Sequence, residues 1–409
     1  MLLKSQLVVT TIGTWIWGLL LLVGFGLSVW IIIPAPIFAL LPLSVGAPEI
    51  SPGLMIFNVI VLILGCIGWR FNSSQSPRLL IFALCVGGLA LVLSASPLIQ
   101  FPAAIDRSQS TIEASLGRGY LGEIAPEITA KMRSQPLVIP DIWGKIPIPQ
   151  VRVDRQIPFA NPDGVPLYLN IYRPLQVGKY PAIVSIYGGA WQRGSPDSDD
   201  TFNRYIAAQG YVVWAISYRH APAYKFPAQI EDVKLALTFI QNNAAKNETD
   251  LDRVAFIGRS AGAQLAMLAA YEHSPFPVRA LVNYYGPVNL TAGYDDVPTP
   301  DPIESRVKLR AFLGGTPTEF PDRYYQASPI NTIKPDLPAS LLIYGRKDHI
   351  IQSKYGRSLD RSLRSHGNRT VFIEIPWADH AFDAVFSGVS NQLALYYTER
   401  FLAWALLRE

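Results

Sequence analysis

Charged residues are almost absent from the first quarter of the chain, and this feature limits most strongly what the chain can fold into. Residues 1–105 contain four charges: Lys4, Glu49, Arg70 and Arg78. The other 304 residues hold the remaining 62 of the chain's 35 basic and 31 acidic side chains. A stretch this poor in charge is typical of a segment inside a bilayer. We therefore expect a membrane segment over residues 1–105, followed by a water-soluble part.

Three uncharged apolar runs divide this segment. They cover residues 7–33, 53–69 and 79–99 and have lengths of 27, 17 and 21 residues. Since about 20 helical residues cross the core of a bilayer, the runs predict three transmembrane helices. A cleavable signal peptide is the alternative for the first run, but the apolar core of such a peptide has only about 7–15 residues.

Positive charges beside the runs predict the orientation of the chain. Lys4 precedes the first run, and Arg70 and Arg78 flank the connection between the second and third runs. The connection 34–52 has no Lys or Arg. Because Lys and Arg are retained on the cytoplasmic side, the N-terminus is expected inside. Residues 100–409 of this integral membrane protein are then predicted on the extracytoplasmic side.

The composition of the whole chain argues against other classes of protein. The net charge is only +4 and no run of Lys or Arg is present, so no nucleic-acid partner is expected. The two cysteines, Cys66 and Cys85, both lie in apolar stretches. Neither a disulfide scaffold nor thiol chemistry is therefore expected in the soluble part.

Residues 106–150 are rich in proline and predict a linker. Within it, Ser110 and Glu113 have the spacing of a capping box, which predicts the start of an amphipathic helix.

From residue 151 onwards, short β-rich runs alternate with helical ones, and residues 161–164 form a turn between the first two runs. The predicted strands are 151–157, 166–172, 181–187, 211–217, 252–257, 278–284, 338–344 and 370–375, and the predicted helices are 199–209, 227–244, 260–271, 352–366 and 388–407. This alternation predicts an α/β domain over 151–409, with a mainly parallel sheet, helices on both faces and an antiparallel opening hairpin.

The sharpest chemical signal is the sequence Gly-Arg-Ser-Ala-Gly at 258–262. It directly follows the apolar run 254–257 and precedes a helical run, which is the context of a nucleophile elbow. The glycines permit a tight turn that exposes the hydroxyl of Ser260, and the helix N-terminus favours negative charge there. Ser260 is therefore the predicted nucleophile.

A serine hydroxyl needs a base to take its proton and an acid to orient that base. Asp348 follows the predicted strand 338–344, and His380 follows the predicted strand 370–375. We therefore predict Asp348 as the orienting acid and His380 as the base. The other histidines are expected to be solvated or core side chains: His220, His273, His349 and His366. Two further acids are too close in sequence to His380 to orient it and are interpreted as loop residues: Asp379 and Asp383.

Backbone amides are also needed to hold the negative charge of a tetrahedral intermediate. The sequence Tyr-Gly-Gly-Ala-Trp at 187–191 ends a predicted strand, and its two glycines allow close approach to an oxyanion. The predicted oxyanion donors are the amides of Gly188, Gly189 and Ala261. Trp191 is interpreted either as a residue at the mouth of the site, against the acyl group, or as a core aromatic under the loop.

Together these stretches resemble the α/β-hydrolase superfamily, in its esterase branch. That branch includes hormone-sensitive-lipase-like carboxylesterases, feruloyl-esterase-like enzymes, kynurenine formamidase and prenylcysteine methylesterase. The resemblance covers about 150–409 and extends to further stretches at 217–222, 226–228, 285–288 and 327–330. It implies the α/β-hydrolase fold and a Ser-His-Asp mechanism through an acyl-enzyme, with no metal and no cofactor.

The chain also departs from the family pattern. Tyr187 stands where the oxyanion loop usually has His, and Ser217 replaces an Asp. Ala263 stands where serine peptidases of the prolyl-oligopeptidase type have a second Gly, which favours an esterase. The aromatic-rich insertion 291–330 either forms a wall of the acyl pocket or covers the sheet.

The predicted function is that of a membrane-anchored serine hydrolase, a carboxylesterase or lipase-like enzyme that acts on a small or lipidic ester. Two alternatives stay open: an acyltransferase or amidase with the same triad, and a non-catalytic binding module on a hydrolase scaffold. The complete set of triad residues favours an enzyme over a binding module. The sequence predicts neither the natural ester, nor its acyl length, nor the oligomeric state.

Overall fold

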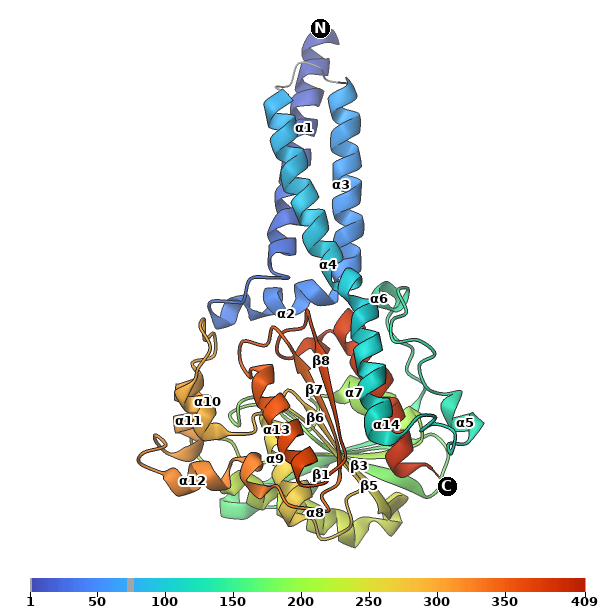
Figure 1. Cartoon of the computed structure of the whole chain (residues 1–409), viewed down its shortest axis with the longest axis vertical. Coiled ribbons are helices and arrows are strands. Elements are labelled where there is room, and N and C mark those ends of the chain that lie inside the picture. The colour runs from blue at the N-terminus through green and yellow to red at the C-terminus, as the bar shows by residue number, and fades with distance from the viewer. Residues whose placement is uncertain (1, 72–76, 409) are drawn as a thin grey trace.

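The computed structural model describes residues 2–71 and 77–408. Three long helices form an upright bundle above an α/β domain, and a short helix, α2, lies between the two parts (Figure 1). The bundle and this connection consist of α1 (Leu2–Val29), η1 (Phe38–Leu40), α2 (Leu41–Glu49), α3 (Ser51–Phe71) and α4 (Pro77–Leu116).

Two helices in the described part of the chain are long and apolar enough to cross a membrane. These are the stretches Ser51–Arg70 and Leu80–Leu116. In α1, the apolar stretch Gly13–Val29 is shorter, and the side chains of residues 7–12 lie outside the described ones. The structure thus shows two apolar helices of spanning length where the sequence predicted three.

A polar contact joins the three helices of the bundle. The side-chain amide of Asn58 on α3 donates to the hydroxyl of Ser28 on α1 at 3.0 Å and to that of Ser94 on α4 at 3.1 Å. A polar group in an apolar bundle is costly unless it is paired, so these bonds fix the register of the helices. Gly65 allows α3 to approach α1, because a Cβ there would lie 2.3 Å from the ring of Trp17.

Helix α4 continues through the boundary that was predicted after residue 105. It has 40 residues, and its lower half packs against β8, where the Ser115 hydroxyl donates to the carbonyl of Thr370 at 2.6 Å. The predicted capping box is wrong. Ser110 lies inside the helix and its hydroxyl donates back to the carbonyl of Asp106, because the buried side chain of Ile112 holds this stretch helical against the domain.

The stretch after α4 belongs to the core of the α/β domain. Its apolar side chains are buried together with those of the sheet: Tyr120, Ile124, Met132 and Ile146. The backbone amide of Arg133 donates to the buried carboxylate of Glu399 at 2.7 Å. Residues 117–150 therefore cover one side of the domain.

In the described residues, eight strands form one sheet in the order β1-β2-β4-β3-β5-β6-β7-β8. The strands are β1 (Val151–Ala160), β2 (Leu167–Pro174), β3 (Tyr180–Ile186), β4 (Val212–Ile216), β5 (Thr249–Arg259), β6 (Ala280–Tyr284), β7 (Ala339–Gly345) and β8 (Thr370–Ile375). β1 and β2 form an antiparallel hairpin, β2 is antiparallel to β4, and all other pairs are parallel. The predicted mainly parallel sheet is confirmed.

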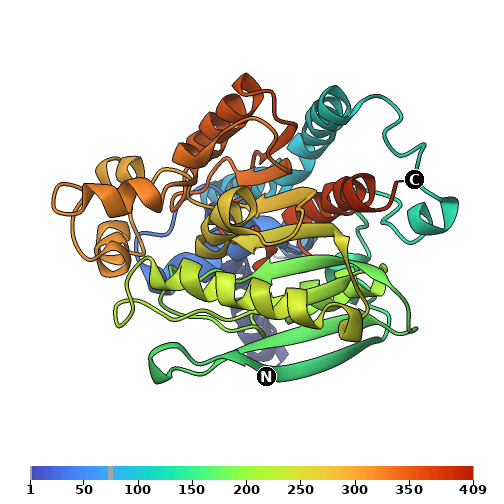
Figure 2. The ribbon, with the colours of Figure 1, turned by 90° about the horizontal axis from the view of Figure 1, so that it is seen from below.

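The helices of the domain lie on both faces of the sheet (Figure 2). They are α5 (Pro126–Thr129), α6 (Asp141–Gly144), α7 (Asp200–Ala208), α8 (Ala228–Asn243), α9 (Ala261–Leu268), α10 (Leu290–Asp295), α11 (Ser305–Leu313), α12 (Pro321–Gln326), α13 (Ser353–Ser365) and α14 (Val389–Leu406). Successive side chains of a strand point to opposite faces. On β6, Asn283 contacts Met267 of α9, whereas Tyr284 contacts Thr398 of α14, so α9 and α14 lie on opposite faces.

Each of the remaining long helices packs on the same face of the sheet as α9 or as α14. α7 shares the α14 face, because the hydroxyl of Tyr205 donates to Glu399 on α14. α13 lies on the α9 face, where Gly356 abuts the ring of Tyr344 and that residue's hydroxyl accepts from Asn283. α8 packs beside α9. The predicted helical cover on both faces is present.

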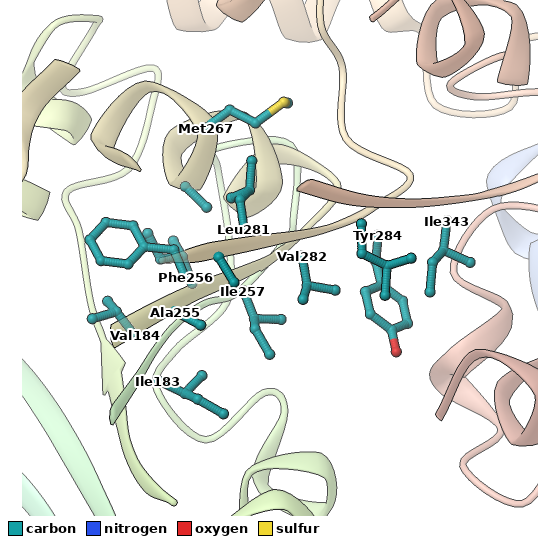
Figure 3. Packing of buried hydrophobic residues seen from close by; sticks show 14 of the residues in the cluster. Ile183, Val184, Ala255, Phe256, Ile257, Met267, Leu281, Val282, Tyr284 and Ile343 are labelled. Atoms are coloured by element: carbon teal, nitrogen blue, oxygen red, sulfur yellow. The ribbon is translucent and has the colours of Figure 1, made fainter. Parts of the chain in front are cut away.

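The core lies along the central strands β3, β5, β6 and β7. Their side chains are fully buried on both faces, among them Ile183, Phe256, Val282 and Ile343 (Figure 3). Parallel strands that helices cover on both sides have sequences that are nearly continuous apolar runs. The sheet is therefore a rigid platform, and its strand ends carry the site.

Helix α2 is attached to the domain through Glu49. This carboxylate is fully buried at the N-terminus of α14, where it accepts from the backbone amide of Ser390 at 2.8 Å and from its hydroxyl at 2.5 Å. Gly388 leaves room for it, because a Cβ there would lie 2.4 Å from Glu49 Oε2. Burial raises the pKa of Glu49 to about 8, in spite of these hydrogen bonds.

This pKa predicts how stability depends on pH. The folded protein holds the proton of Glu49 more tightly than the unfolded chain does. Protonated Glu49 therefore contributes to the free energy of unfolding near pH 5, and this contribution is lost as the pH rises through about 8. In detergent, the melting temperature of the wild type should fall relative to that of Glu49→Gln between pH 5 and 9, by an amount equivalent to a few kcal/mol. A melting temperature of the wild type that rises relative to that of the variant over this range would contradict the raised pKa.

Candidate active site

Ser260 lies at a sharp turn between β5 and α9. Its φ of 49° and ψ of −123° are a strained conformation for a residue with a side chain. Two glycines make the turn possible. A Cβ on Gly262 would lie 2.1 Å from the carbonyl oxygen of Ile186, and one on Gly258 would lie 2.4 Å from Ala263 Cα. The strand-turn-helix context that was predicted for Ser260 is present.

Ser260, His380 and Asp348 form a chain of hydrogen bonds. The distance from Ser260 Oγ to His380 Nε2 is 3.0 Å, and that from His380 Nδ1 to Asp348 Oδ2 is 2.8 Å. The other carboxylate oxygen of Asp348 accepts from the backbone amides of Ile350 at 2.9 Å and Ile351 at 2.7 Å. The acid is thereby fixed in one rotamer, and it fixes the orientation of the imidazole.

The loop that carries His380 follows β8 and is held by Asp379. Asp379 Oδ1 accepts from the backbone amide of His380 at 2.7 Å and also lies 2.7 Å from Nδ1 of His349. The ring of Tyr285 packs against the imidazole of His380, with 4.6 Å between the ring centroids. Asp379 thus positions the backbone, while Asp348 contacts the ring.

The other histidines lie outside this chain of hydrogen bonds. His349 is buried against Asp379, and His220 lies 2.9 Å from the Tyr187 hydroxyl. His366 is exposed at the end of α13, and His273 is half-buried at the end of the helical turn η4 (Ala269–His273). None of these four imidazoles contacts Ser260 in the described residues.

The predicted oxyanion residues lie beside the elbow. A Cβ on Gly188 would lie 2.8 Å from the carbonyl of Arg259 and 3.1 Å from Ser260 Cβ, so only glycine permits this approach. Gly189 has a φ of +127°, which also favours glycine. Ala261 begins α9, directly after Ser260. All three residues therefore lie beside Ser260, and their role as oxyanion donors stays a prediction.

Tyr187, which stands where the resembled esterases have a histidine, is held by packing and by hydrogen bonds. Its ring stacks on Tyr218 at 4.6 Å, its hydroxyl lies 2.9 Å from Nε2 of His220, and its carbonyl accepts from the Tyr218 hydroxyl at 3.1 Å. Burial lowers the pKa of His220 and raises that of Tyr187. The hydrogen bond between the phenol and the imidazole holds the start of the loop.

Trp191 is a buried residue that also borders the site. Its ring stacks on Phe312 of α11 at 4.1 Å, and its indole N–H donates to Gln264 at 2.9 Å. The insertion 291–330 covers Trp191 with Phe312, while Leu309 of the same helix lines a cavity at Ser260. The insertion therefore lies beside the site, and its role as a wall of the acyl pocket stays a prediction.

Arg259 forms a buried ion cluster under the site. Its Nε lies 2.5 Å from Asp383 and its Nη1 lies 3.4 Å from Asp199. The guanidinium lies over the ring of Phe202 at 4.1 Å, and Asp383 also accepts from the hydroxyl of Tyr285. Burial raises the pKa of Asp199. Burial alone would lower the pKa of Arg259, but the nearby charges of Asp199 and Asp383 raise this pKa above its usual value.

This cluster was not predicted from the sequence. Arg259 occupies the variable position of the Gly-x-Ser-x-Gly pattern, and its partners are more than 50 residues away on each side. Asp383 was interpreted as a loop residue, but it connects Arg259 to Tyr285, which packs on His380. The only signal was an arginine inside an otherwise apolar strand end.

Two cavities meet at Ser260. The large one has a volume of about 760 Å³ and the small one about 60 Å³. Within the described residues, no group of three or more His, Cys, Asp or Glu side chains is arranged to hold a metal ion.

Comparison with known proteins agrees with this geometry. The BD-FAE family model matches residues 169–363, which include Ser260 and Asp348. By this match and by its fold, the domain is similar to α/β-hydrolase esterases. The hyperthermophilic esterase from the archaeon Pyrobaculum calidifontis superposes with a TM-score of 0.54 and 26% identity, over 63% of this chain and 86% of that one. A bacterial heroin esterase shares the fold, with a TM-score of 0.56 and 22% identity over 71% of this chain and 99% of that one.

Curated relatives of this chain are named as esterases. The probable carboxylic ester hydrolase LipM of Mycobacterium tuberculosis is 30% identical over 239 residues, which are 55% of this chain and 54% of that protein. Esterase LipC of the same organism is 32% identical over 233 residues, 53% of this chain and 57% of that protein. The chain thus spans little more than half the length of these relatives.

Proposed function

We propose that this α/β-hydrolase is a membrane-anchored serine carboxylesterase. The observation that carries the proposal is the hydrogen-bonded chain from Ser260 through His380 to Asp348 at the meeting point of two cavities. The names of the relatives support ester hydrolysis. A binding module would not require the strained turn at Ser260 or the oriented imidazole beside it.

Acylation begins with the attack of Ser260 Oγ on the carbonyl carbon of the ester. His380 Nε2 takes the hydroxyl proton as the new C–O bond forms, and Asp348 stabilises the resulting imidazolium. The amides of Gly188, Gly189 and Ala261 hold the oxyanion. The bond from the carbonyl carbon to the alcohol oxygen then breaks, and the alcohol leaves with the proton from His380.

Deacylation repeats these steps with water. His380 takes a proton from the water molecule as its oxygen attacks the acyl carbon, and the bond to Ser260 Oγ then breaks. The proton returns from His380 to Ser260, and the acid is released. An acyltransferase or an amidase would use the same acyl-enzyme with a different acceptor or leaving group, and the names of the relatives favour the ester.

Membrane anchoring is the second part of the proposal. The apolar surfaces of α3 and α4 and the apolar stretch of α1 support three spans, and the positions of Lys4, Arg70 and Arg78 support an extracytoplasmic α/β domain. A reporter fused to the C-terminus should be active only if it functions outside the cytoplasm. Activity of a reporter that works only in the cytoplasm would overturn the orientation.

The activity itself is tested with the full chain in isolated membranes. These membranes should hydrolyse 4-methylumbelliferyl acetate, and an organophosphate such as diethyl p-nitrophenyl phosphate should abolish the hydrolysis with one phosphoryl group per chain. Membranes that contain the folded protein and hydrolyse no ester in a panel of short acyl esters would contradict the proposal.

A further inference from the structure

The two cavities at Ser260 divide the site into unequal halves. Ser260 lines both the large cavity of about 760 Å³ and the small one of about 60 Å³. An ester bound at Ser260 has two parts, and each part extends to one side of the attacked carbonyl. The question is which part enters which cavity.

The position of His380 answers this question. In the described residues, His380 lines the large cavity and is not among the side chains that line the small one. In a Ser-His-Asp mechanism the imidazole delivers its proton to the leaving alcohol. The alcohol part therefore extends into the large cavity, and the acyl part extends into the small one.

The size of the small cavity limits the acyl group. Its walls include apolar side chains from the insertion and from the loops after β3, β6 and β7: Trp191, Val288, Leu290, Leu309 and Ile350. A dry apolar cavity of about 150 Å³ is large enough to bind benzene, and this one is less than half as large. It accommodates an acyl group of only a few carbon atoms.

The large cavity has one apolar and one polar side. Its apolar side comes from the connection between the first two bundle helices, namely Phe38 of η1 and Leu41, Pro42 and Val45 of α2. Polar side chains of the domain also line this cavity, among them Gln192, Arg193 and Lys308. Such a lining matches an amphiphilic alcohol that has both an apolar chain and a polar end.

The apolar side of the large cavity is continuous with an exposed apolar surface at the base of the bundle. Phe38 lines the cavity and is also 49% exposed, and its ring lies against the guanidinium of Arg193 at 4.7 Å. Further large apolar side chains of the connections around the base are exposed: Ile32, Ile33, Ile37, Ile50 and Trp143. Figure 1 shows α2 and α6 at the lower end of the bundle, where a bilayer around the helices would end.

We propose that the substrate is a short-acyl ester of an amphiphilic alcohol that resides in the bilayer. The alcohol passes over Phe38 from the membrane into the large cavity, and the acyl group of a few carbons enters the small cavity. This inference rests on the proposed esterase function. The enzyme thus releases a short acid to water, while the alcohol returns to the membrane.

Two isomeric esters test the inference directly. Hexadecyl acetate has a short acyl group and a long alcohol, whereas ethyl hexadecanoate has the same atoms with the lengths reversed. The full-length wild type, reconstituted in phosphatidylcholine vesicles that contain one or the other, should hydrolyse hexadecyl acetate at least tenfold faster, as measured by the acid released. Equal rates, or faster hydrolysis of ethyl hexadecanoate, would overturn the inference.

Variants in the two cavities should separately change the preference for a membrane-resident alcohol and the preference for a short acyl group. Leu41→Asp in the large cavity should lower the rate on vesicular hexadecyl acetate relative to soluble 4-methylumbelliferyl acetate by at least tenfold. Val288→Ala in the small cavity should raise the ratio of butanoate to acetate hydrolysis several-fold. Leu235→Asp and Leu235→Ala, on the exposed side of α8, are the matched controls and should change neither ratio.

The outcomes separate this inference from the proposed function. If soluble 4-methylumbelliferyl acetate is hydrolysed and neither isomer is, the esterase stands and the membrane-resident substrate is wrong. If no ester is hydrolysed by folded protein, the proposed function itself fails. Unchanged selectivity in both cavity variants would show that the two cavities do not bind the two parts of the ester.

Discussion

Replacing Ser260 with alanine is expected to lower kcat/KM for 4-methylumbelliferyl acetate by about 10⁴- to 10⁶-fold. The reason is the direct hydrogen bond of 3.0 Å between Ser260 Oγ and His380 Nε2, which makes the hydroxyl the group that the imidazole activates. His380→Ala is expected to cause a loss of similar size, because no other imidazole contacts Ser260 in the described part of the chain.

The double variant makes this prediction sharper. Because the two groups act as one unit, Ser260→Ala combined with His380→Ala should be no less active than either single variant. Ser365→Ala and His366→Ala, two exposed positions at the end of α13, are the matched controls and should retain wild-type activity. Losses that add in the double variant would show that Ser260 and His380 act independently.

Replacing Arg259 with methionine is expected to destabilise the domain by about 3–5 kcal/mol. Methionine keeps much of the side chain's volume but removes the charge that compensates Asp383 and Asp199, both of which are buried or nearly so. For a domain of this size, such a loss corresponds to a fall in melting temperature of roughly 10 °C. Thermal unfolding in detergent, followed by tryptophan fluorescence, measures it.

The same variant should also affect activity in the protein that remains folded. Asp383 would lose its partner, and through the hydroxyl of Tyr285 the packing of His380 would change. Arg361→Met, on the exposed side of α13, is the control and should change the melting temperature by no more than about 2 °C. An Arg259→Met protein with wild-type stability would show that the buried cluster does not depend on this charge.

The strands and the triad could be predicted because their signals are local. A fully buried parallel strand has a continuous apolar run, and each residue of the predicted triad comes within five residues after such a run. The sequence therefore located Ser260, Asp348 and His380, and the structure brings them together. Their roles in catalysis stay a proposal.

The bounds of α4 could not be predicted in the same way. The spacing of Ser110 and Glu113 is that of a capping box, but a mid-helix serine also satisfies its hydroxyl by donating to the carbonyl four residues earlier, here that of Asp106. The buried packing of Ile112 against the domain decides between these two states. That packing depends on residues more than 250 positions away.

The other features that could not be predicted are contacts between residues far apart in the sequence. Glu49 is the one acidic residue in the first 105, and nothing near it in sequence indicates that it binds the start of α14 through Ser390. Phe38 and Leu41 read as part of an apolar connection between spans, yet they line the cavity at Ser260. Each of these contacts joins segments that only the folded chain brings together.

Labelling with a fluorescent fluorophosphonate tests the central claim most directly. Membranes with the full-length wild type, Ser260→Ala and Ser365→Ala are incubated with the probe, and the labelled peptide is identified by mass spectrometry. The account predicts that the wild type and Ser365→Ala are labelled on Ser260 and that Ser260→Ala is not labelled. Labelling of another residue, or none of the folded wild type, would contradict it.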